Sequence, residues 1–559
     1  MRYRISEVRI DPDQYADGPN RKKYIEQALR RKLRKLHRRS GRGRTQKQGS
    51  GPSNIEIIRE SIDARRKPDV KAVYTLDFDY PGQLPLPEGG RQEYQALRAF
   101  PSGAARATAA EQGIGAEQGT GVARPVIAGF GPCGIFAALI LAEAGLDPIV
   151  LERGKPAEER FRDVQRFWEQ GILDPESNVQ FGEGGAGTFS DGKLTTGIRD
   201  VRIRKVLREF TDAGADPAIL YQQRPHIGTD KLRQIIPAIR RRIEEAGGEV
   251  RFGTKLTGLE TEDGKLTGVR TVRSGQTERI PARHLVLAIG HSARDTFRML
   301  RETGLDMEQK PFSIGVRIEH PQEQIDRAQY GDPALAEIFG PASYKLHYRC
   351  QNGRGVYTFC MCPGGQVINA SSEEGGAVTN GMSESKRDSG TANSGLLVDV
   401  RTSDFPGEDP LAGVELQRRY ERLAREMGRD QKGGLPRTVY GRFPQPDDPV
   451  RQCLPAFAAE AIEEAMPHLG RMLEGFDDEQ AVMTAVETRS SSPVRILRDD
   501  DMQTKIRGVI PAGEGPGYAG GIMSAAVDGI RAAEQIIREY AAEYVAEYAA
   551  ENTDKRNEK

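Results

Sequence analysis

The sequence predicts an α/β protein whose main domain is doubly wound, with three layers built around a parallel sheet. The first observation is a short apolar strand at residues 125–128 that runs into a glycine-rich turn at residues 129–134 and then into an apolar helix. The second is another apolar strand at residues 148–151, as expected of a strand–helix–strand unit. The third is the return of strand character at residues 285–292 and 502–510. The long interval between those two strands predicts a second domain inserted into the first.

The glycine-rich turn has the pattern G-x-G-x-x-G and suits a dinucleotide. Gly129 allows a tight turn, Gly131 lets the backbone approach a pyrophosphate, and Gly134 lets the helix pack against the strand. The helix that follows offers free N–H groups and a positive dipole end to phosphates. Glu152, at the tip of the second strand, would accept hydrogen bonds from a ribose. Because the context matches as well as the pattern, a Rossmann-like nucleotide site is favoured over a glycine-rich turn without a ligand.

Length and composition exclude several classes of protein. The chain has 559 residues, which is enough for two to four domains, and its formal net charge is zero, so the whole molecule has no nucleic-acid signature. Five cysteines in so long a chain make no disulfide framework. The first residues are too charged for a signal peptide. The uncharged run at residues 126–142 is interpreted as the buried strand and helix rather than a membrane span, so we expect a cytoplasmic protein without a membrane partner.

The N-terminal part predicts a small separate α/β domain over residues 1–85. A strand at residues 3–10, a basic helix at residues 21–36 and two strands between residues 55 and 80 follow one another. The segment at residues 37–53 is rich in Gly, Ser and Arg. A solvated loop is the favoured interpretation, and a basic patch that touches RNA is the alternative.

Composition sets the remaining boundaries. Residues 86–122 have no periodicity and little apolar content, so we predict a linker with few contacts across it. Strand-like runs with longer turns after residue 310 predict an inserted mixed-sheet substrate domain. The predicted parts are therefore residues 1–85, the linker 86–122, the nucleotide-binding domain 123–310 and 484–540, the inserted domain 311–483, and a charged tail at 541–559.

Three further segments supply candidate site residues. A glycine-dense loop at residues 182–194, which ends in Lys193 and Leu194, suits a backbone lying against a planar ligand, with a flexible surface loop as the alternative. His291 follows a buried strand and could line the site, although a structural role is more common for such a histidine. The polar stretch at residues 371–396 is either mobile or functional. Its substrate candidates are Asn380, Ser383 and Asn393.

The cysteines leave the chemistry open. Cys360 and Cys362 form a C-x-C pair that could make a strained disulfide or a charge-transfer thiolate, although packing at the domain interface is favoured. The pair has no partner pair for zinc, so no metal site is predicted. No catalytic acid, base or nucleophile can be named, because the sequence does not show which side chains meet in space.

Together these motifs resemble a family of bacterial FAD-dependent dehydrogenases of uncharacterised substrate, within the glutathione-reductase-type flavoproteins that lack a separate NAD domain. The resemblance rests on G-x-G-P-x-G with V-L-E-R-G, FGEGGAGTFSDGKL, TFCMCPGG, SSEEGG and AGEGPGYAGGI. It implies bound FAD and does not imply a substrate. The implied FAD-binding residues are Gly129, Gly131, Pro132, Gly134, Glu152, Arg153, Gly185, Gly187, Thr188, Lys193, Gly290, Gly513, Glu514, Gly520, Gly521 and Ile522.

By this resemblance, Gly129, Gly131 and Gly134 would hold the pyrophosphate, and Lys193 would lie near the isoalloxazine ring. Glu514 and the helix start after it would meet the ribityl chain and the pyrimidine edge of the flavin. No second G-x-G-x-x-G unit follows, so we expect electrons from a substrate or from an unknown donor or acceptor. The predicted function is a FAD-dependent oxidoreductase whose small organic substrate binds between the two domains. A flavoprotein that docks to RNA through the N-terminal domain and a flavin-binding sensor remain the alternatives.

Overall fold

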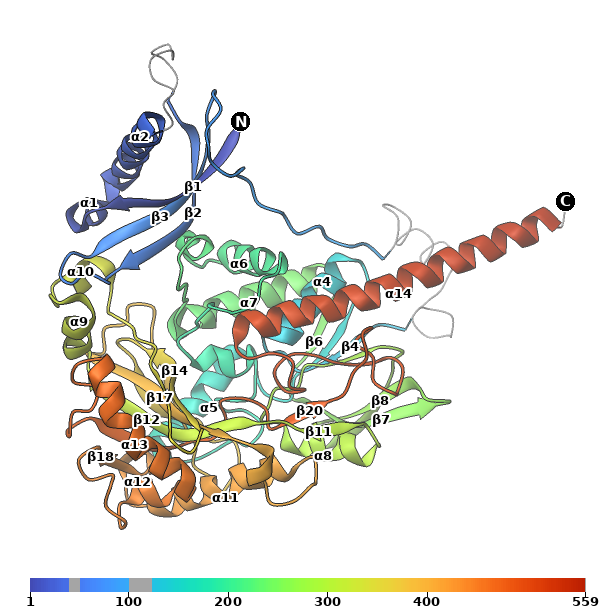
Figure 1. Ribbon diagram of the computed structural model, residues 1–559. Coiled ribbons are helices and arrows are strands. Elements are labelled where there is room, and N and C mark those ends of the chain that lie inside the picture. Colours follow the sequence, from blue (N-terminus) through green and yellow to red (C-terminus); the bar gives the residue numbers. More distant parts are fainter. Residues whose placement is uncertain (40–50, 100–122, 558–559) are drawn as a thin grey trace.

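A computed structural model describes residues 1–39, 51–99 and 123–557. Its centre is a parallel sheet, of which β4 and β6 are labelled in Figure 1. The strand order is β6-β5-β4-β10-β21, which corresponds to chain order 3-2-1-4-5. This is the Rossmann order, and ligands of such sheets bind where the order reverses, here between β4 and β10. The strands are β4 (Val126–Ala128), β5 (Ile149–Leu151), β6 (Glu249–Arg251), β10 (Leu285–Leu287) and β21 (Val509–Pro511).

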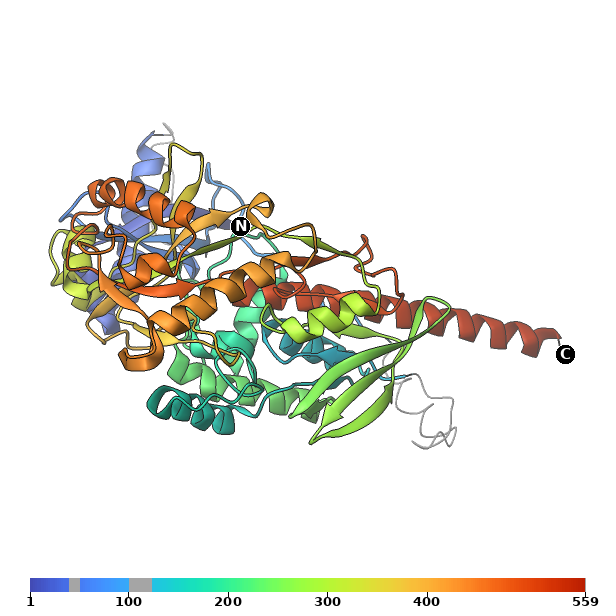
Figure 2. The ribbon, with the colours of Figure 1, turned by 90° about the horizontal axis from the view of Figure 1, so that it is seen from below.

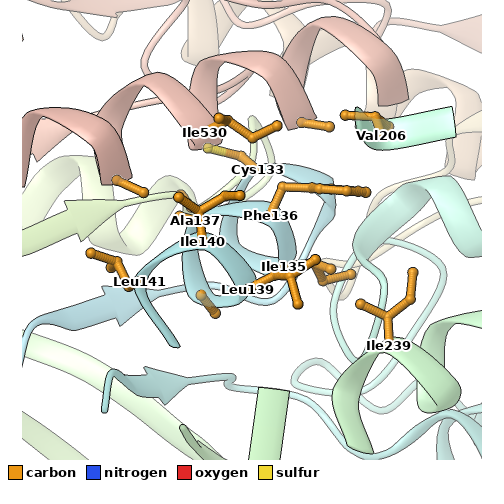
Figure 3. Packing of buried hydrophobic residues seen from close by; sticks show 14 of the residues in the cluster. Cys133, Ile135, Phe136, Ala137, Leu139, Ile140, Leu141, Val206, Ile239 and Ile530 are labelled. Atoms are coloured by element: carbon orange, nitrogen blue, oxygen red, sulfur yellow. The ribbon is translucent and has the colours of Figure 1, made fainter. Parts of the chain in front are cut away.

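Helices cover one face of the parallel sheet. The apolar helix after the glycine-rich turn, α4, is buried on nearly all sides because α14 and α7 pack beside it. Figure 3 shows Phe136 and Ile140 of α4 in this core, with Ile530 of α14 and Ile239 of α7 close to the same helix. The helices of this domain are α4 (Pro132–Glu143), α5 (Ala157–Gln170), α6 (Arg202–Asp212), α7 (Thr229–Glu245), α8 (Arg294–Glu302) and α14 (Ile522–Asn557).

The opposite face is covered mainly by a three-stranded antiparallel sheet. Leu256, Val269 and Ile280 of this sheet share a hydrophobic cluster with Val126 and Leu285 of the parallel strands. The domain therefore has the three predicted layers, with a sheet and α8 forming the second outer layer (Figure 2). The strands are β7 (Thr254–Glu262), β8 (Lys265–Arg273) and β9 (Gln276–Pro281), and a separate antiparallel pair joins β11 (Met307–Gln309) to β20 (Val494–Ile496).

The chain between β11 and β20 forms a second unit around a six-stranded sheet in the order β13-β14-β17-β12-β19-β18. We expected a mixed sheet, but all the pairings in it are antiparallel. Its strands are β12 (Phe312–Pro321), β13 (His347–Arg349), β14 (Gly355–Cys362), β17 (Thr391–Val400), β18 (Arg437–Val439) and β19 (Val482–Glu487), and its helices are α9 (Gln322–Tyr330), α10 (Leu335–Phe339), α11 (Ala412–Met427), α12 (Pro449–Gln452) and α13 (Ala456–Met472).

Two boundaries in this unit differ from the prediction. The sheet continues through β19 to Glu487, so residues 484–487 belong to it rather than to the nucleotide-binding domain. The polar stretch at residues 371–396 is not one long loop, because it contains β16 (Thr379–Met382), which pairs with β15 (Gln366–Asn369), and the first residues of β17. The sequence of β16 and of the first residues of β17 gives no strand pattern, because small and polar residues alternate there and some of the polar side chains are buried.

The N-terminal unit has the predicted strand–helix–strand–strand order. Its antiparallel sheet, β1-β3-β2, packs against α2 through Ile5, Leu29 and Phe78. Residues 40–50 of the basic segment lie outside the described residues, and α2 extends to Arg39. The elements are β1 (Arg2–Ile10), α1 (Pro12–Ala16), α2 (Arg21–Arg39), β2 (Ser53–Asp63) and β3 (Lys71–Asp79).

The expectation of few contacts between this unit and the rest is wrong. Val70 is fully buried in the hydrophobic cluster of the inserted unit, and Tyr15 packs against Phe339 with ring centroids 5.1 Å apart. The backbone N–H of Glu60 donates to Tyr221 across the boundary at 2.8 Å. The predicted linker is also ordered over residues 86–99, where it bonds to β1 and packs against the main core; residues 100–122 lie outside the described residues.

The C-terminal helix, α14, extends beyond the packed part of the molecule. In Figures 1 and 2, α14 runs from the main core to the C-terminal end as one projecting helix. Among the described residues, no helix is long and apolar enough to cross a membrane.

Candidate functional site

A cavity of about 520 Å³ opens at the carboxyl ends of β4, β5 and β10, where the strand order reverses. The nucleotide-binding domain lines it with Gly129, Gly131 and Glu152, and the inserted sheet lines it with Cys360 and Glu487. Volumes of this size are typical of small-molecule and cofactor sites. The two units therefore share one site.

The glycine-rich turn forms the floor of the cavity. Gly129 has φ +103°, and a Cβ there would overlap the carbonyl oxygen of Ala288 on the neighbouring strand end. A Cβ on Gly134 would overlap the carbonyl oxygen of Gly129, so these two glycines are required by the protein's own packing. Gly131 differs, because a Cβ there would meet only the Cα of Gly185, 3.7 Å away. The space beside Gly131 is open for a ligand, as the motif predicts.

Glu152 is held in place by backbone donors. Its carboxylate accepts hydrogen bonds from the N–H groups of Phe130 and Gly154 at 2.8 Å and of Gly182 at 2.9 Å. A carboxylate has about four acceptor positions, so one is left for a ribose hydroxyl. The side chain lines the cavity although its residue is only 4% exposed.

Arg153 also lines this end of the cavity, with its charge already paired. Its guanidinium makes a bidentate contact with Asp295 and a 2.6 Å contact with Glu176, and it lies 4.2 Å from the ring centroid of Phe181. An arginine fixed in this way presents a planar surface rather than an unpaired charge.

The glycine-dense loop forms one side wall. Gly185, Gly187 and Lys193 line the cavity, as expected of a loop that lies against a ligand. Thr188 does not line it, because its hydroxyl donates to the carbonyl of Glu183 in the interior of the loop. The short helix at Gly185–Phe189 turns this side chain away from the cavity.

The strand ends of β10 and β21 form the opposite wall with Gly290, Gly520, Gly521 and Ile522. Gly513, which the resemblance placed in the FAD site, packs instead against Cys133, and its N–H donates to Asp528. A Cβ on Gly513 would lie 2.8 Å from that of Cys133, so this glycine serves the close approach of β21 to α4.

Glu514 and His291 face each other in this wall, with 3.8 Å between Oε1 and Nε2. Burial raises the pKa of Glu514 to about 7, and burial together with Arg489 lowers the pKa of His291 to about 3. His291 is therefore neutral at physiological pH, and Glu514 can exchange a proton there.

The wall from the inserted sheet is built around a fully buried arginine, Arg317 of β12. It pairs with Glu487 at 2.7 Å and donates to the side-chain oxygen of Asn380 at 2.9 Å and to that of Asn393 at 3.2 Å. It also donates to the backbone carbonyl of Cys360 at 2.9 Å. Arg317 thus orients three cavity-lining residues, Glu487 of β19, Asn380 of β16 and Cys360 of β14.

The candidates from the polar stretch separate into two groups. Asn380 lines the cavity, whereas Asn393 is fully buried behind it on Arg317. Ser383 is also buried, and its hydroxyl donates to Asp191 in the glycine-dense loop. Asn393 and Ser383 therefore position other residues and cannot contact a substrate in this arrangement.

Glu487 is a titratable group that the sequence analysis missed. It lines the cavity, and burial raises its pKa to about 7 against the opposing effect of Arg317. Tyr357 lines the cavity beside it, and its hydroxyl lies 2.7 Å from that of Ser313. Neither residue stands in a glycine-rich motif, so only the fold reveals them.

Lys193 meets the two cysteines of the C-x-C pair. Its amino group lies 3.9 Å from the sulfur of Cys360, 3.7 Å from that of Cys362 and 3.7 Å from a carboxylate oxygen of Asp191. Burial lowers the pKa of Lys193, but the two sulfurs and Asp191 outweigh that effect and raise it. Among the described residues, no group of three or more His, Cys, Asp or Glu side chains could hold a metal ion.

The fold and this cavity define a Rossmann-type dinucleotide-binding protein. A family model described as "FAD-dependent protein, C-terminal domain-like" matches residues 311–447 and 445–490. An uncharacterized protein from Clostridium beijerinckii is 42% identical over 517 residues, which cover 87% of this chain and 93% of that protein. The chain therefore belongs to a family of uncharacterised bacterial FAD-dependent proteins, and its cofactor is FAD.

Similar solved structures are distant. The glycerol-3-phosphate dehydrogenase from Bacillus halodurans, complexed with FAD, is 12% identical with a TM-score of 0.36 over 76% of this chain and 65% of that one. A geranylgeranyl bacteriochlorophyll reductase-like protein from Thermoplasma acidophilum is 13% identical with a TM-score of 0.35 over 76% and 83% of the two chains. At these scores they carry no argument about the reaction.

The residues present fit the cofactor. The open space beside Gly131 lies at the first turn of α4, where backbone N–H groups have no partners within the helix. Gly290, Gly520 and Gly521 also leave open space where a Cβ would stand. A continuous cavity from the carboxylate of Glu152 to the amino group of Lys193 suits an elongated dinucleotide.

Proposed function

We propose that the protein is a FAD-dependent oxidoreductase acting on a small organic substrate, with the reaction taking place between the nucleotide-binding layer and the inserted sheet. A single observation carries the proposal: Lys193 and Glu514 from one side, and Cys360, Glu487 and Tyr357 from the other, line the same cavity as the glycine-rich turn. Clusters of titratable groups with shifted pKa values are typical of reaction sites.

The bound FAD is the group that accepts or donates a hydride. By this proposal Gly131 and the start of α4 hold its pyrophosphate, Glu152 holds the ribose, and Lys193 lies at the flavin end. The ammonium of Lys193 would stabilise negative charge that develops beside it.

The inserted sheet supplies polar groups for a substrate. Glu487 carries a proton that it can gain or lose near neutral pH, which suits a general acid or base. The amide of Asn380 and the hydroxyl of Tyr357 are placed to orient a polar substrate, and Arg317 fixes both Glu487 and Asn380. The donor or acceptor that completes the cycle is a second, unidentified reactant.

The test is anaerobic mixing of the FAD-loaded protein with fractions of a bacterial metabolite extract, followed through the visible absorbance of the flavin. We expect a small-molecule fraction to reduce the flavin, or to reoxidise flavin that was reduced beforehand, and Glu487→Gln to slow that step by roughly tenfold or more without loss of FAD. Glu474→Gln, at an exposed position that does not line the cavity, is the matched control. Fractions that leave the flavin unchanged in both directions, or equal rates in Glu487→Gln, would contradict the proposal.

A further inference from the structure

The C-x-C pair lies at a break in a regular strand. The pairing between β14 and β17 shifts register between Phe359 and Cys362, so the residues between them form a bulge. Cys360 has φ +43°, a left-handed conformation that is rare for a cysteine. Such bulges change the direction of a side chain, and this one places Cys360 on the cavity wall.

The two sulfurs are neighbours with different surroundings. Both sulfurs lie within 3.9 Å of the amino group of Lys193, and the thiol of Cys362 donates to the backbone carbonyl of Cys360 at 3.3 Å. Cys362 is fully buried, whereas Cys360 is partly exposed to the cavity. Cys360 can therefore meet a reactant, and Cys362 can meet only Cys360. This asymmetry is the arrangement of an attacking thiol and a resolving thiol.

The charges around the pair favour one thiolate. The neighbouring thiol of Cys362, with the cations Lys193 and Arg317, holds the pKa of Cys360 well below its ordinary range against the effect of burial. The neighbouring Cys360, together with burial, raises the pKa of Cys362 well above its ordinary range. Asp191 lies beside Lys193 but pairs chiefly with Arg387, so the ammonium remains available to Cys360.

We propose that Cys360 and Cys362 are a redox-active dithiol that exchanges two electrons with the flavin. In the oxidising direction an S–S bond forms between the Cys360 thiolate and the Cys362 thiol. The two electrons and the proton of Cys362 pass to oxidised FAD, which takes them up as one hydride equivalent, and the reverse step regenerates thiolate and thiol. The other three cysteines, Cys133, Cys350 and Cys453, are buried free thiols and take no part in this step.

This inference deepens the proposed function, because it assigns the route by which electrons enter or leave the flavin. It also accounts for Lys193, whose ammonium touches both sulfurs and lies at the cavity. An external thiol or disulfide would then be a reactant that meets Cys360 first.

The test is an anaerobic reductive titration of the FAD-loaded protein with dithionite, after oxidation with a small disulfide and removal of the excess. The wild-type protein should consume about twice the reducing equivalents per flavin that Cys360→Ser consumes, because the disulfide takes up its own electron pair and the buried Cys362 alone cannot react with the small disulfide. Cys350→Ser, which removes a buried thiol outside the cavity, should titrate like the wild type.

Alkylation of the denatured protein with mass detection gives a second readout that does not depend on turnover. In the oxidised protein only Cys133, Cys350 and Cys453 should be labelled, and reduction should make Cys360 and Cys362 available. Labelling of both after oxidation, with equal titrations for wild type and Cys360→Ser, would overturn the inference. A flavin that still reacts with a metabolite fraction in that case would leave the proposed oxidoreductase function standing.

Discussion

At the residue scale, the cavity combines groups whose protonation is set by their surroundings rather than by their residue type. Glu487 and Glu514 come from different units of the fold, and burial raises the pKa of each to about 7. Across the same cavity, the neighbouring Cys362 together with Lys193 lowers the pKa of Cys360 well below its ordinary range. Proton donors, acceptors and a nucleophile thus meet at one place without a metal ligand set among the described residues.

Gly131→Val tests the assignment of the cofactor site. Gly131 has φ −79°, which any residue adopts, and the space beside it is open, so the variant should fold. The valine side chain would occupy the space for the pyrophosphate, and we expect FAD affinity to fall by at least about tenfold, which corresponds to 1.4 kcal/mol. Gly197→Val, at an exposed glycine with open surroundings, is the control. Full flavin occupancy in Gly131→Val, measured after denaturation, would contradict the site.

Gly134→Val should behave differently, because its side chain would meet the backbone of Gly129 rather than the ligand. We expect the free energy of unfolding to fall by about 1–3 kcal/mol or more, as is typical of overpacking. The loss would be visible as a lower Tm or as insoluble protein. A stable, flavin-free Gly134→Val would show that this glycine serves the ligand.

The raised pKa of Glu514 predicts a pH dependence of stability. In the unfolded chain this carboxyl ionises near 4.5, and in the folded protein near 7, so the folded state retains a proton that the unfolded state has lost. The contribution of this group to the free energy of unfolding is fully present below pH 4.5 and is lost as the pH rises to about 7. The Tm of Glu514→Gln relative to wild type should therefore increase between pH 5 and pH 7 and level off above.

The corresponding change in the free energy of unfolding should be roughly 1–2 kcal/mol, since the side chain of Glu514 keeps 24% exposure and solvent screens its charge. Glu474→Gln, at an exposed position, should show a constant difference from wild type over the same range. A constant difference for Glu514→Gln as well would show that Glu514 is not neutral in the folded protein.

At the element scale, the turn after β14 fixes the positions of the groups around Lys193. Gly364 has φ +51°, and a Cβ there would overlap the carbonyl of Arg387. Arg387 in turn pairs with Asp191, the neighbour of Lys193 in the glycine-dense loop. The turn therefore connects the inserted sheet to the loop that carries the lysine.

Gly364→Ala should disturb this connection. We expect a loss of stability of about 1 kcal/mol from the left-handed backbone and a further 1–3 kcal/mol from the overlap with Arg387. Gly390→Ala isolates the first effect, because Gly390 also has a positive φ, +78°, with no atom near its Cβ position. Thermal unfolding compares the two, and alkylation of Cys360 in the native protein should change only in Gly364→Ala. Equal Tm values for both variants would contradict this account of the turn.

At the scale of the whole molecule, three units contribute to one body. The N-terminal unit covers Phe339 and contributes Val70 to the core of the inserted unit, although the sequence suggested a free module on a linker. The low apolar content of residues 86–122 suggested a linker, but a few apolar residues, such as Leu97 and Ala99, are enough to fix an extended segment on a larger core.

Removal of residues 1–85 should therefore damage the remainder. The truncated protein would expose the ring of Phe339 and the backbone carbonyl of Tyr221, and we expect aggregation on size-exclusion chromatography with a Tm several degrees lower. The double variant Tyr15→Ser and Lys67→Ala weakens the same contact with the chain intact. A monomeric, FAD-loaded truncation with unchanged Tm would show that the contact contributes little.

The sequence predicted the parts of the site that depend on local rules. The turn from Gly129 to Gly134, the acid at Glu152 and the glycine-dense loop are short patterns with a fixed geometry, and all three line or support the cavity. Glu487 and Tyr357 could not be found in this way. They line the same cavity as Lys193 only because the order of β14, β17, β12 and β19 brings distant strands together, and pairing between strands so far apart leaves no local pattern.

The central claim is that the flavin end of the cofactor lies where the inserted sheet meets the nucleotide-binding layer. An experimental structure of the FAD-loaded protein tests it most directly. We expect the adenosine ribose at Glu152, the pyrophosphate at Gly131, and the isoalloxazine ring within contact distance, about 4 Å, of Lys193 and Cys360. An isoalloxazine ring outside the space between Lys193, Glu514 and Glu487, with no residue of the inserted sheet in contact, would contradict the account.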